Sequence, residues 1–259
     1  MSPRGIAAAL AAILLAMPCG AAAAERLVVS LSHHRVLVTS SFAGTEVVLF
    51  GSIERDPATP ARRGYDAVVT VTGPRDTERV RRKERMFGVW VNAQARSFID
   101  VPSYLYVLSD RPLEAIADNE TRRRLQIGFD NFLLPQRIGT DIGDVVRDDP
   151  FRVAFLDLKQ EHGLYREADN AVTLLTPTLF RADIPLPSNA PFGTYEVDIK
   201  LFADGALAAR ATTALEVIKV GFEQLVADTA RDHGFWYGLA LAFLALLTGW
   251  FASVVFSRD

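Results

Sequence analysis

The segment TERVRRKERMFGVW, residues 77–90, is the most distinctive polar stretch of the chain. If it is extended, its side chains alternate between two faces, and four basic residues then share one face: Arg79, Arg81, Lys83 and Arg85. Like charges in a row repel one another, so lipid headgroups, an oxyanion or an acidic protein surface would stabilise them. The alternative is an edge strand whose charges only prevent aggregation.

Other residue types that could do chemistry are poorly placed for it. His33 and His34 would point to opposite faces of a strand, and His162 and His233 lie far away in the sequence. The acidic residues between 141 and 149 lack the spacing of a calcium loop and suit helix capping better. No catalytic signature is present. We therefore expect no metal, no cofactor and no enzymatic activity.

Composition narrows the class of protein further. The chain is 49% hydrophobic and 23% charged with a formal net charge of −3, which gives no reason to expect a nucleic-acid partner. Its single cysteine, Cys19, lies in an N-terminal apolar segment. That segment, IAAALAAILLAM over 6–17 followed by Ala22, Ala23 and Ala24, is typical of a secretory signal peptide cleaved after Ala24. An uncleaved N-terminal helix is the alternative.

The C-terminal segment 235–256 contains no Asp, Glu, Lys or Arg. As a helix it would be about 33 Å long, enough to cross a hydrocarbon core of about 30 Å. We predict a transmembrane helix there, with 257–259 as a cytoplasmic stub; a lipid-anchor signal is the rival interpretation. Within this segment, Thr248 and Gly249 would allow a second helix to pack closely, although such small residues are also common without that role.

Short runs rich in β-branched residues fill positions 25–109 and indicate an N-terminal β-sandwich portion. Residues 110–163 are expected to form a helical insert. Its first helix follows Pro112, and its second begins at the cap Asp149 and ends at Gly163.

β structure returns over 164–218, where Asp204 and Gly205 separate two alternating runs and predict a hairpin. Tyr195 indicates either a tyrosine corner or an ordinary strand start with a buried tyrosine. In residues 219–234 the apolar residues recur at the spacing of a helix, so we predict a juxtamembrane helix there. The expected fold is therefore mainly β with a helical insert, an immunoglobulin-like antiparallel sandwich, and one C-terminal transmembrane helix.

The sequence resembles the alphaproteobacterial putative transmembrane protein family, whose function is uncharacterised. The residues that carry the resemblance span nearly the whole chain: Lys83-Glu84-Arg85, Gly88-x-Trp90-x-Asn92, Val101-Pro102-Ser103-Tyr104, Leu179-Phe180-Arg181-Ala182, Pro191-x-Gly193-x-Tyr195, Lys219-Val220-Gly221-Phe222-Glu223, Tyr237-Gly238-Leu239 and Thr248-Gly249-Trp250. The resemblance implies a bacterial inner-membrane protein with a periplasmic body. It also implies an association with a sulfite-exporter-type permease, and it assigns no active site.

Two functions follow as expectations. The first is a non-enzymatic accessory protein in the inner membrane, with its bulk in the periplasm and its C-terminus in the cytoplasm, that contacts lipid and docks onto another integral membrane protein such as an anion permease. The second is a periplasmic module that binds an oxyanion with the basic residues of 79–85. An enzyme whose site forms only on folding is the third alternative.

Overall fold

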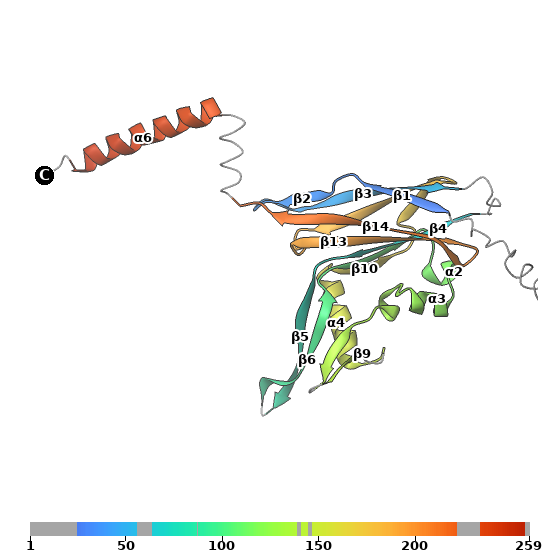
Figure 1. Ribbon diagram of the computed structural model, residues 1–259. Helices are drawn as coiled ribbons and strands as arrows, with labels where there is room; N and C mark the ends of the chain where they lie inside the picture. Colours follow the sequence, from blue (N-terminus) through green and yellow to red (C-terminus); the bar gives the residue numbers. More distant parts are fainter. Residues whose placement is uncertain are drawn as a thin grey trace, which may run out of the picture.

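The computed structural model describes residues 25–55, 64–86, 88–138, 141–144, 147–221 and 234–256. Within these residues the chain is mainly β, as predicted (Figure 1). The predicted signal peptide, most of the predicted juxtamembrane helix and the C-terminal stub lie outside them.

Two sheets form a sandwich. The first has four antiparallel strands in the order β1 (Arg26–Leu31), β3 (Gly44–Glu54), β12 (Leu179–Pro187), β11 (Val172–Thr176). The second has six strands in the order β10 (Tyr165–Ala168), β7 (Leu105–Ser109), β4 (Asp66–Thr72), β13 (Gly193–Ala203), β14 (Ala206–Lys219), β2 (Arg35–Val38). Strands from before residue 110 and from after residue 164 therefore share both sheets.

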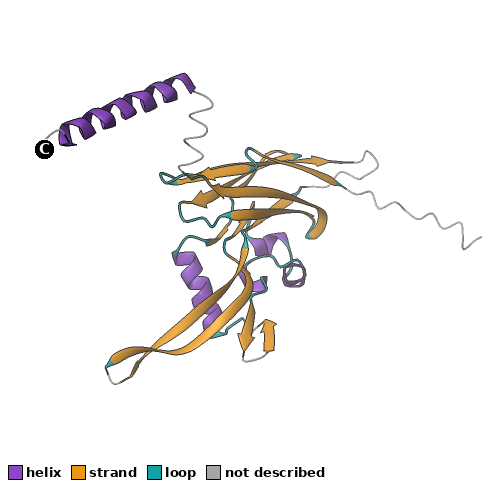
Figure 2. Cartoon of the chain, turned by 60° about the vertical axis from the view of Figure 1, so that its left-hand side comes forward, coloured by secondary structure: helices purple, strands orange, loops and turns teal. Residues whose placement is uncertain are grey.

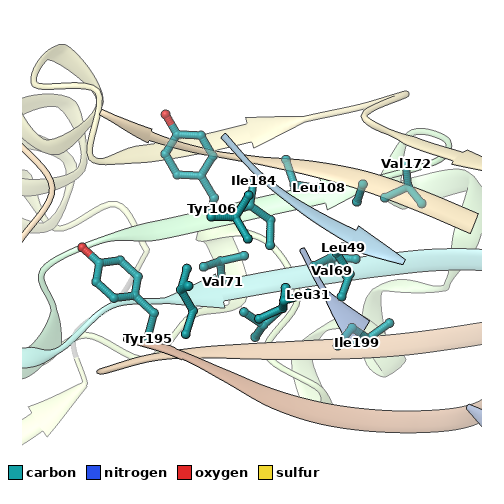
Figure 3. Packing of buried hydrophobic residues seen from close by; sticks show 14 of the residues in the cluster. Leu31, Leu49, Val69, Val71, Tyr106, Leu108, Val172, Ile184, Tyr195 and Ile199 are labelled. Carbon is teal, nitrogen blue, oxygen red and sulfur yellow. The ribbon is translucent and has the colours of Figure 1, made fainter. Parts of the chain in front are cut away.

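The core of the sandwich follows from strand alternation. Every second side chain points inward, so Leu31 and Leu49 of one sheet meet Val69 and Ile199 of the other (Figure 3). All four are at most 5% exposed, and burying an aliphatic side chain of this size contributes roughly 1.5–3 kcal/mol. A core of this kind needs no disulfide to hold it together.

The six-stranded sheet is also buried on its outer face. Val68 points away from the sandwich and packs in a second core with Phe98 and Phe155. A third sheet and several short helices supply the rest of this layer. The strand order of the third sheet is β5 (Arg75–Met86), β6 (Val89–Pro102), β8 (Pro135–Ile138), β9 (Asp141–Asp144). The helices are α2 (Leu113–Ile116), α3 (Asn119–Arg124), the 3-10 helix η1 (Phe129–Asn131) and α4 (Pro150–Glu161).

Local signals in the sequence are confirmed at two places. Asp204 and Gly205 join β13 to β14 with φ angles of 51° and 78°, as a two-residue turn of type I′ requires. Asp149 caps α4 by accepting hydrogen bonds of 3.0 Å from the backbone N–H groups of Phe151 and Arg152.

Two features differ from expectation. The helix expected after Pro112 is split at Ala117, which is extended, and Asp118 caps the second piece by accepting from the N–H of Thr121. The sheets are not wholly antiparallel either, because β10 pairs with β7, and β14 with β2, in parallel. Parallel neighbours need a long crossover, which the helical segment between β7 and β10 supplies.

The transmembrane prediction is corrected. Residues 234–256 do form a helix, α6 (Gly234–Phe256), on which Phe243, Leu246 and Trp250 are exposed. Among the residues that the structure describes, however, no helix is both long enough and apolar enough to cross a membrane.

Candidate functional site: a basic arm and a charged pocket

β5 and β6 form a long two-stranded ribbon that extends away from the body of the protein (Figure 1, Figure 2). β8 pairs with β6 only at Ser97 and Phe98, so beyond this point no other described strand joins the ribbon. We call residues 79–96 the basic arm. The arm holds six basic residues and one acidic residue, Glu84, a net charge of +5. Because the whole chain carries −3, the remainder carries −8.

The four basic residues singled out in the sequence lie at alternate positions of β5, and all are exposed: Arg79, Arg81, Lys83 and Arg85. The pairing with β6 skips Ala93, a bulge that increases the twist of the ribbon. Alternate residues of a strand lie about 7 Å apart, so each neighbouring pair of charges repels by roughly 0.6 kcal/mol in water. This repulsion is small, and attraction to an acidic surface would outweigh it.

The tip of the arm is apolar. Val89 and Trp90 are 64% and 66% exposed, and Trp90 lies directly across the ribbon from Arg85. Charge alone would protect an edge strand from aggregation, but that role does not require an exposed tryptophan. Tryptophan and arginine are the residue types that most often dominate the energy of protein interfaces.

The root of the arm is fixed to the body. Phe98 of β6 stacks on Phe155 of α4 with 4.4 Å between ring centroids. Lys159 of α4, 7% exposed, places its Nζ 2.5 Å from Oε1 of Glu78 on β5. The hydroxyl of Tyr165 donates to the carbonyl of Pro102 at 2.5 Å. The arm therefore projects from a rigid base, although a two-stranded ribbon by itself is marginally stable.

A separate pocket of about 240 Å³ lies on the outer face of the six-stranded sheet. We call it the Asp198 pocket. Its floor is formed by residues of β4, β13 and β14: Thr70, Thr72, Glu196, Asp198, Lys200 and Arg210. Arg75, Arg124 and Gln126 are among the residues at its rim. Gln126 has a φ of 52°, which turns the chain immediately after α3.

Asp198 is the centre of the pocket's ion pairs. The ammonium of Lys200 donates to Oδ2 of Asp198, and both groups are buried, at 3% and 8% exposure. Arg210 adds two hydrogen bonds, from Nε to Oδ1 at 2.7 Å and from Nη2 to Oδ2 at 3.1 Å. These hydrogen bonds raise the pKa of Arg210. Two cations thus compensate one buried carboxylate, as a buried charge requires.

A second hollow, of about 450 Å³, lies beside α4 and η1. Buried Arg152 donates to the carbonyls of Phe129 and Phe132 at 2.9 and 2.8 Å. Glu167 accepts from the N–H of Phe129, and burial raises the pKa of its carboxyl group. These contacts join η1 to α4 and β10, so they stabilise the layer that carries the arm.

The histidines do not converge. His33 and His34 are exposed in the turn before β2, His162 caps the C-terminus of α4, and His233 lies outside the described residues. In the described part of the chain no three His, Cys, Asp or Glu side chains are grouped to hold a metal ion.

The pair proposed for helix packing lies on α6. The hydroxyl of Thr248 donates to the carbonyl of Leu244, one turn earlier, at 2.7 Å. A Cβ at Gly249 would meet no heavy atom within 4 Å. Both positions are exposed, and no described segment packs against them.

Comparison with known families then identifies the chain. A family model described as "putative transmembrane protein" matches residues 26–258. The chain belongs to this family. The resemblance stated from the sequence is thereby confirmed, and membership in this transmembrane family is consistent with a membrane location. None of the curated proteins compared with the chain matches it.

The Asp198 pocket was missed by sequence reasoning. Glu196, Asp198 and Lys200 alternate with apolar residues along β13, a pattern that predicts a strand with one solvent-facing side. The signal that could have been used is the polar row Thr70 and Thr72 on β4, whose side chains must face the same way once β4 pairs with β13. That pairing joins residues more than a hundred positions apart, and no local pattern specifies it.

Proposed function

We propose that this member of the family is a non-enzymatic accessory protein that docks through its basic arm onto an acidic surface of another membrane protein. The class of partner suggested by the family resemblance is an anion permease of the sulfite-exporter type. The body of the chain would lie on the periplasmic side of the bacterial inner membrane, because residues 1–24 have the pattern of an export signal.

The observation that carries this proposal is the arm itself. A ribbon of net charge +5 exposes Trp90 at its end, and the other residues of the chain together carry −8. Opposite charges steer two surfaces together and accelerate their association. Trp90 would become buried on docking and would then supply most of the affinity. The fixed root at Phe98 reduces the entropy that docking would otherwise cost.

The rival function, binding of an oxyanion by Arg79, Arg81, Lys83 and Arg85, is less well supported by this geometry. The four side chains are exposed along one face of a projecting ribbon. None of them lines the two cavities described above. Small anions are held by donors that converge from several sides, which a single strand does not provide.

The test is co-purification of the full chain from native membranes in mild detergent, followed by quantitative mass spectrometry. The test variant replaces the four residues of the basic row by Gln: Arg79→Gln, Arg81→Gln, Lys83→Gln and Arg85→Gln. A matched control removes the same charge from exposed arginines outside the arm: Arg26→Gln, Arg55→Gln, Arg123→Gln and Arg137→Gln.

We expect one integral membrane protein to be recovered in fixed ratio with the wild type and the control. Its recovery should fall at least about tenfold with the test variant, and also at high salt, because exposed charges are screened. Recovery of the same partner with the test variant contradicts the proposal. The proposal is also contradicted if the wild-type protein is recovered without a partner and binds equally well, in a flotation assay, to anionic vesicles that contain no protein.

A further inference from the structure

We infer that the Asp198 pocket binds a small oxyanion, that is, a sulfate, phosphate or carboxylate group. This site is separate from the basic arm and does not depend on the proposed docking function.

The floor of the Asp198 pocket contains buried donors that lack acceptors. The hydroxyl of Thr70 is buried, the residue being 4% exposed, and among the described residues it has no hydrogen-bond partner. The ammonium of Lys200 has three N–H donors but within the described chain it donates only to Asp198. Buried polar groups nearly always have partners, so a ligand with several acceptor atoms would complete this floor.

The lining of the Asp198 pocket is positively charged. Four basic residues line the pocket against two acidic ones, which leaves a net charge of +2. Asp198 is already compensated by Lys200 and Arg210. Arg75 is held at the rim by Asp100, through the backbone carbonyl at 2.9 Å and the carboxylate at 3.4 Å, which reduces the excess to +1. Arg124 forms no ion pair with any described residue. A water molecule would satisfy the free donors but not the excess positive charge, and an anion satisfies both.

The Asp198 pocket is small, and its floor is rigid. A volume of about 240 Å³ is below the range of about 300–1,000 Å³ for drug-sized ligands, so the occupant has few heavy atoms. The floor lies on three neighbouring strands, on which Thr70 pairs with Asp198 and Lys200 with Arg210. Donors held on paired strands need little reorganisation to bind.

Titration calorimetry on the purified full chain tests the inference directly. Sodium sulfate, inorganic phosphate and sodium acetate are the probes, and an uncharged sugar is the blank. Thr70→Val removes the partnerless hydroxyl, and Arg124→Gln removes the rim charge without breaking an ion pair. Arg123→Gln is the matched control, because Arg123 is exposed on the same helix and does not line the pocket.

We expect binding of at least one oxyanion with a stoichiometry of one. Thr70→Val and Arg124→Gln should each weaken it at least about tenfold, with Arg123→Gln unchanged. Thermal unfolding of the unliganded Thr70→Val protein should match the wild type, which separates lost binding from lost fold. The arm variant with four Gln substitutions should bind as the wild type does.

Two results overturn the inference. One is the absence of binding heat for all three anions. The other is binding that Arg124→Gln weakens no more than Arg123→Gln, which means an adventitious ion only. Neither result bears on docking by the arm, and loss of docking in the arm variant does not bear on the pocket.

Discussion

The basic arm and the Asp198 pocket are built from the same residue types and use them in opposite ways. In the pocket, Lys200 and Asp198 are at most 8% exposed, and each is paired. On the arm, Arg81 and Lys83 are exposed and point from one face of an isolated ribbon. A buried charge is tolerated only when it is compensated, whereas an exposed one costs little to hold. The Asp198–Lys200 pair therefore contributes to the stability of the fold, and the arm's charges are available for a partner.

The largest expected effect is a difference in the free energy of unfolding between variants of the pocket and variants of the arm. Asp198→Ala leaves Lys200 buried without its carboxylate and should lower the free energy of unfolding by about 3–5 kcal/mol. Arg81→Ala on the arm should change it by no more than about 0.5 kcal/mol. Urea denaturation of the two purified variants measures both values. Similar losses in the two proteins would remove the distinction.

Asp110 is a buried carboxylate that is compensated less completely than Asp198, so its contribution to the free energy of unfolding should depend on pH. Asp110 accepts from the N–H of Ala67 at 2.9 Å, but the Nε of Arg111 is 4.0 Å away. Burial, with nearby Asp66, raises the pKa of Asp110 from 3.8 to about 6. The folded state then binds the proton more tightly than the unfolded state. The free energy of unfolding should therefore fall as pH rises from about 4 to about 6, by roughly 2 kcal/mol.

Urea denaturation at pH 4, 5, 6 and 7 measures this dependence. Asp110→Asn should remove that part of the slope, since the amide does not titrate, while leaving the rest of the profile in place. If the variant follows the wild type over this range, Asp110 is not the group responsible.

An ion pair between Lys159 and Glu78 fixes the root of the arm. Glu78 is 32% exposed at its side chain, so it can rehydrate when its partner is lost. Lys159→Met should lower the free energy of unfolding by about 1 kcal/mol, which is less than the effect of Asp198→Ala. The double variant Lys159→Met with Glu78→Gln should recover most of that loss, which a double-mutant cycle by urea denaturation detects. A full loss that the second substitution does not relieve would mean that packing of the lysine stem matters more than its charge.

The smallest expected effect is on the arm. Replacing Arg79, Arg81, Lys83 and Arg85 by Gln should leave the free energy of unfolding unchanged or raise it by up to about 1 kcal/mol, because mutual repulsion is removed. The gain should vanish in 0.5 M salt, where screening is strong. Thermal unfolding at low and high salt measures it. A destabilised variant would show that the arm's charges support the fold.

Sequence patterns predicted what local chemistry determines. The turn at Asp204 and Gly205, the cap at Asp149 and the alternating basic residues of β5 each depend on neighbours a few positions away. The hydroxyl of Tyr195 also donates to the carbonyl of Pro191 at 2.6 Å, the hydrogen bond expected of a tyrosine corner.

What could not be predicted depends on distant segments. On α4, Lys159 is buried, whereas the adjacent Leu158 is 45% exposed. The helical period alone does not predict which of the two side chains is buried. The buried Lys159 donates to Glu78, about eighty positions away. The Asp198 pocket has the same origin, because its rim comes from α3 and its floor from β4, β13 and β14.

Site-specific photo-crosslinking in intact cells tests most directly whether the arm is the docking surface. A photoreactive residue at position 90 should crosslink to one membrane protein, and the Gln variant of the basic row should abolish that product. The same residue at position 175, which is comparably exposed on β11 of the opposite sheet, should give no such product. An identical crosslinked product from both positions, or none from position 90, would contradict the account.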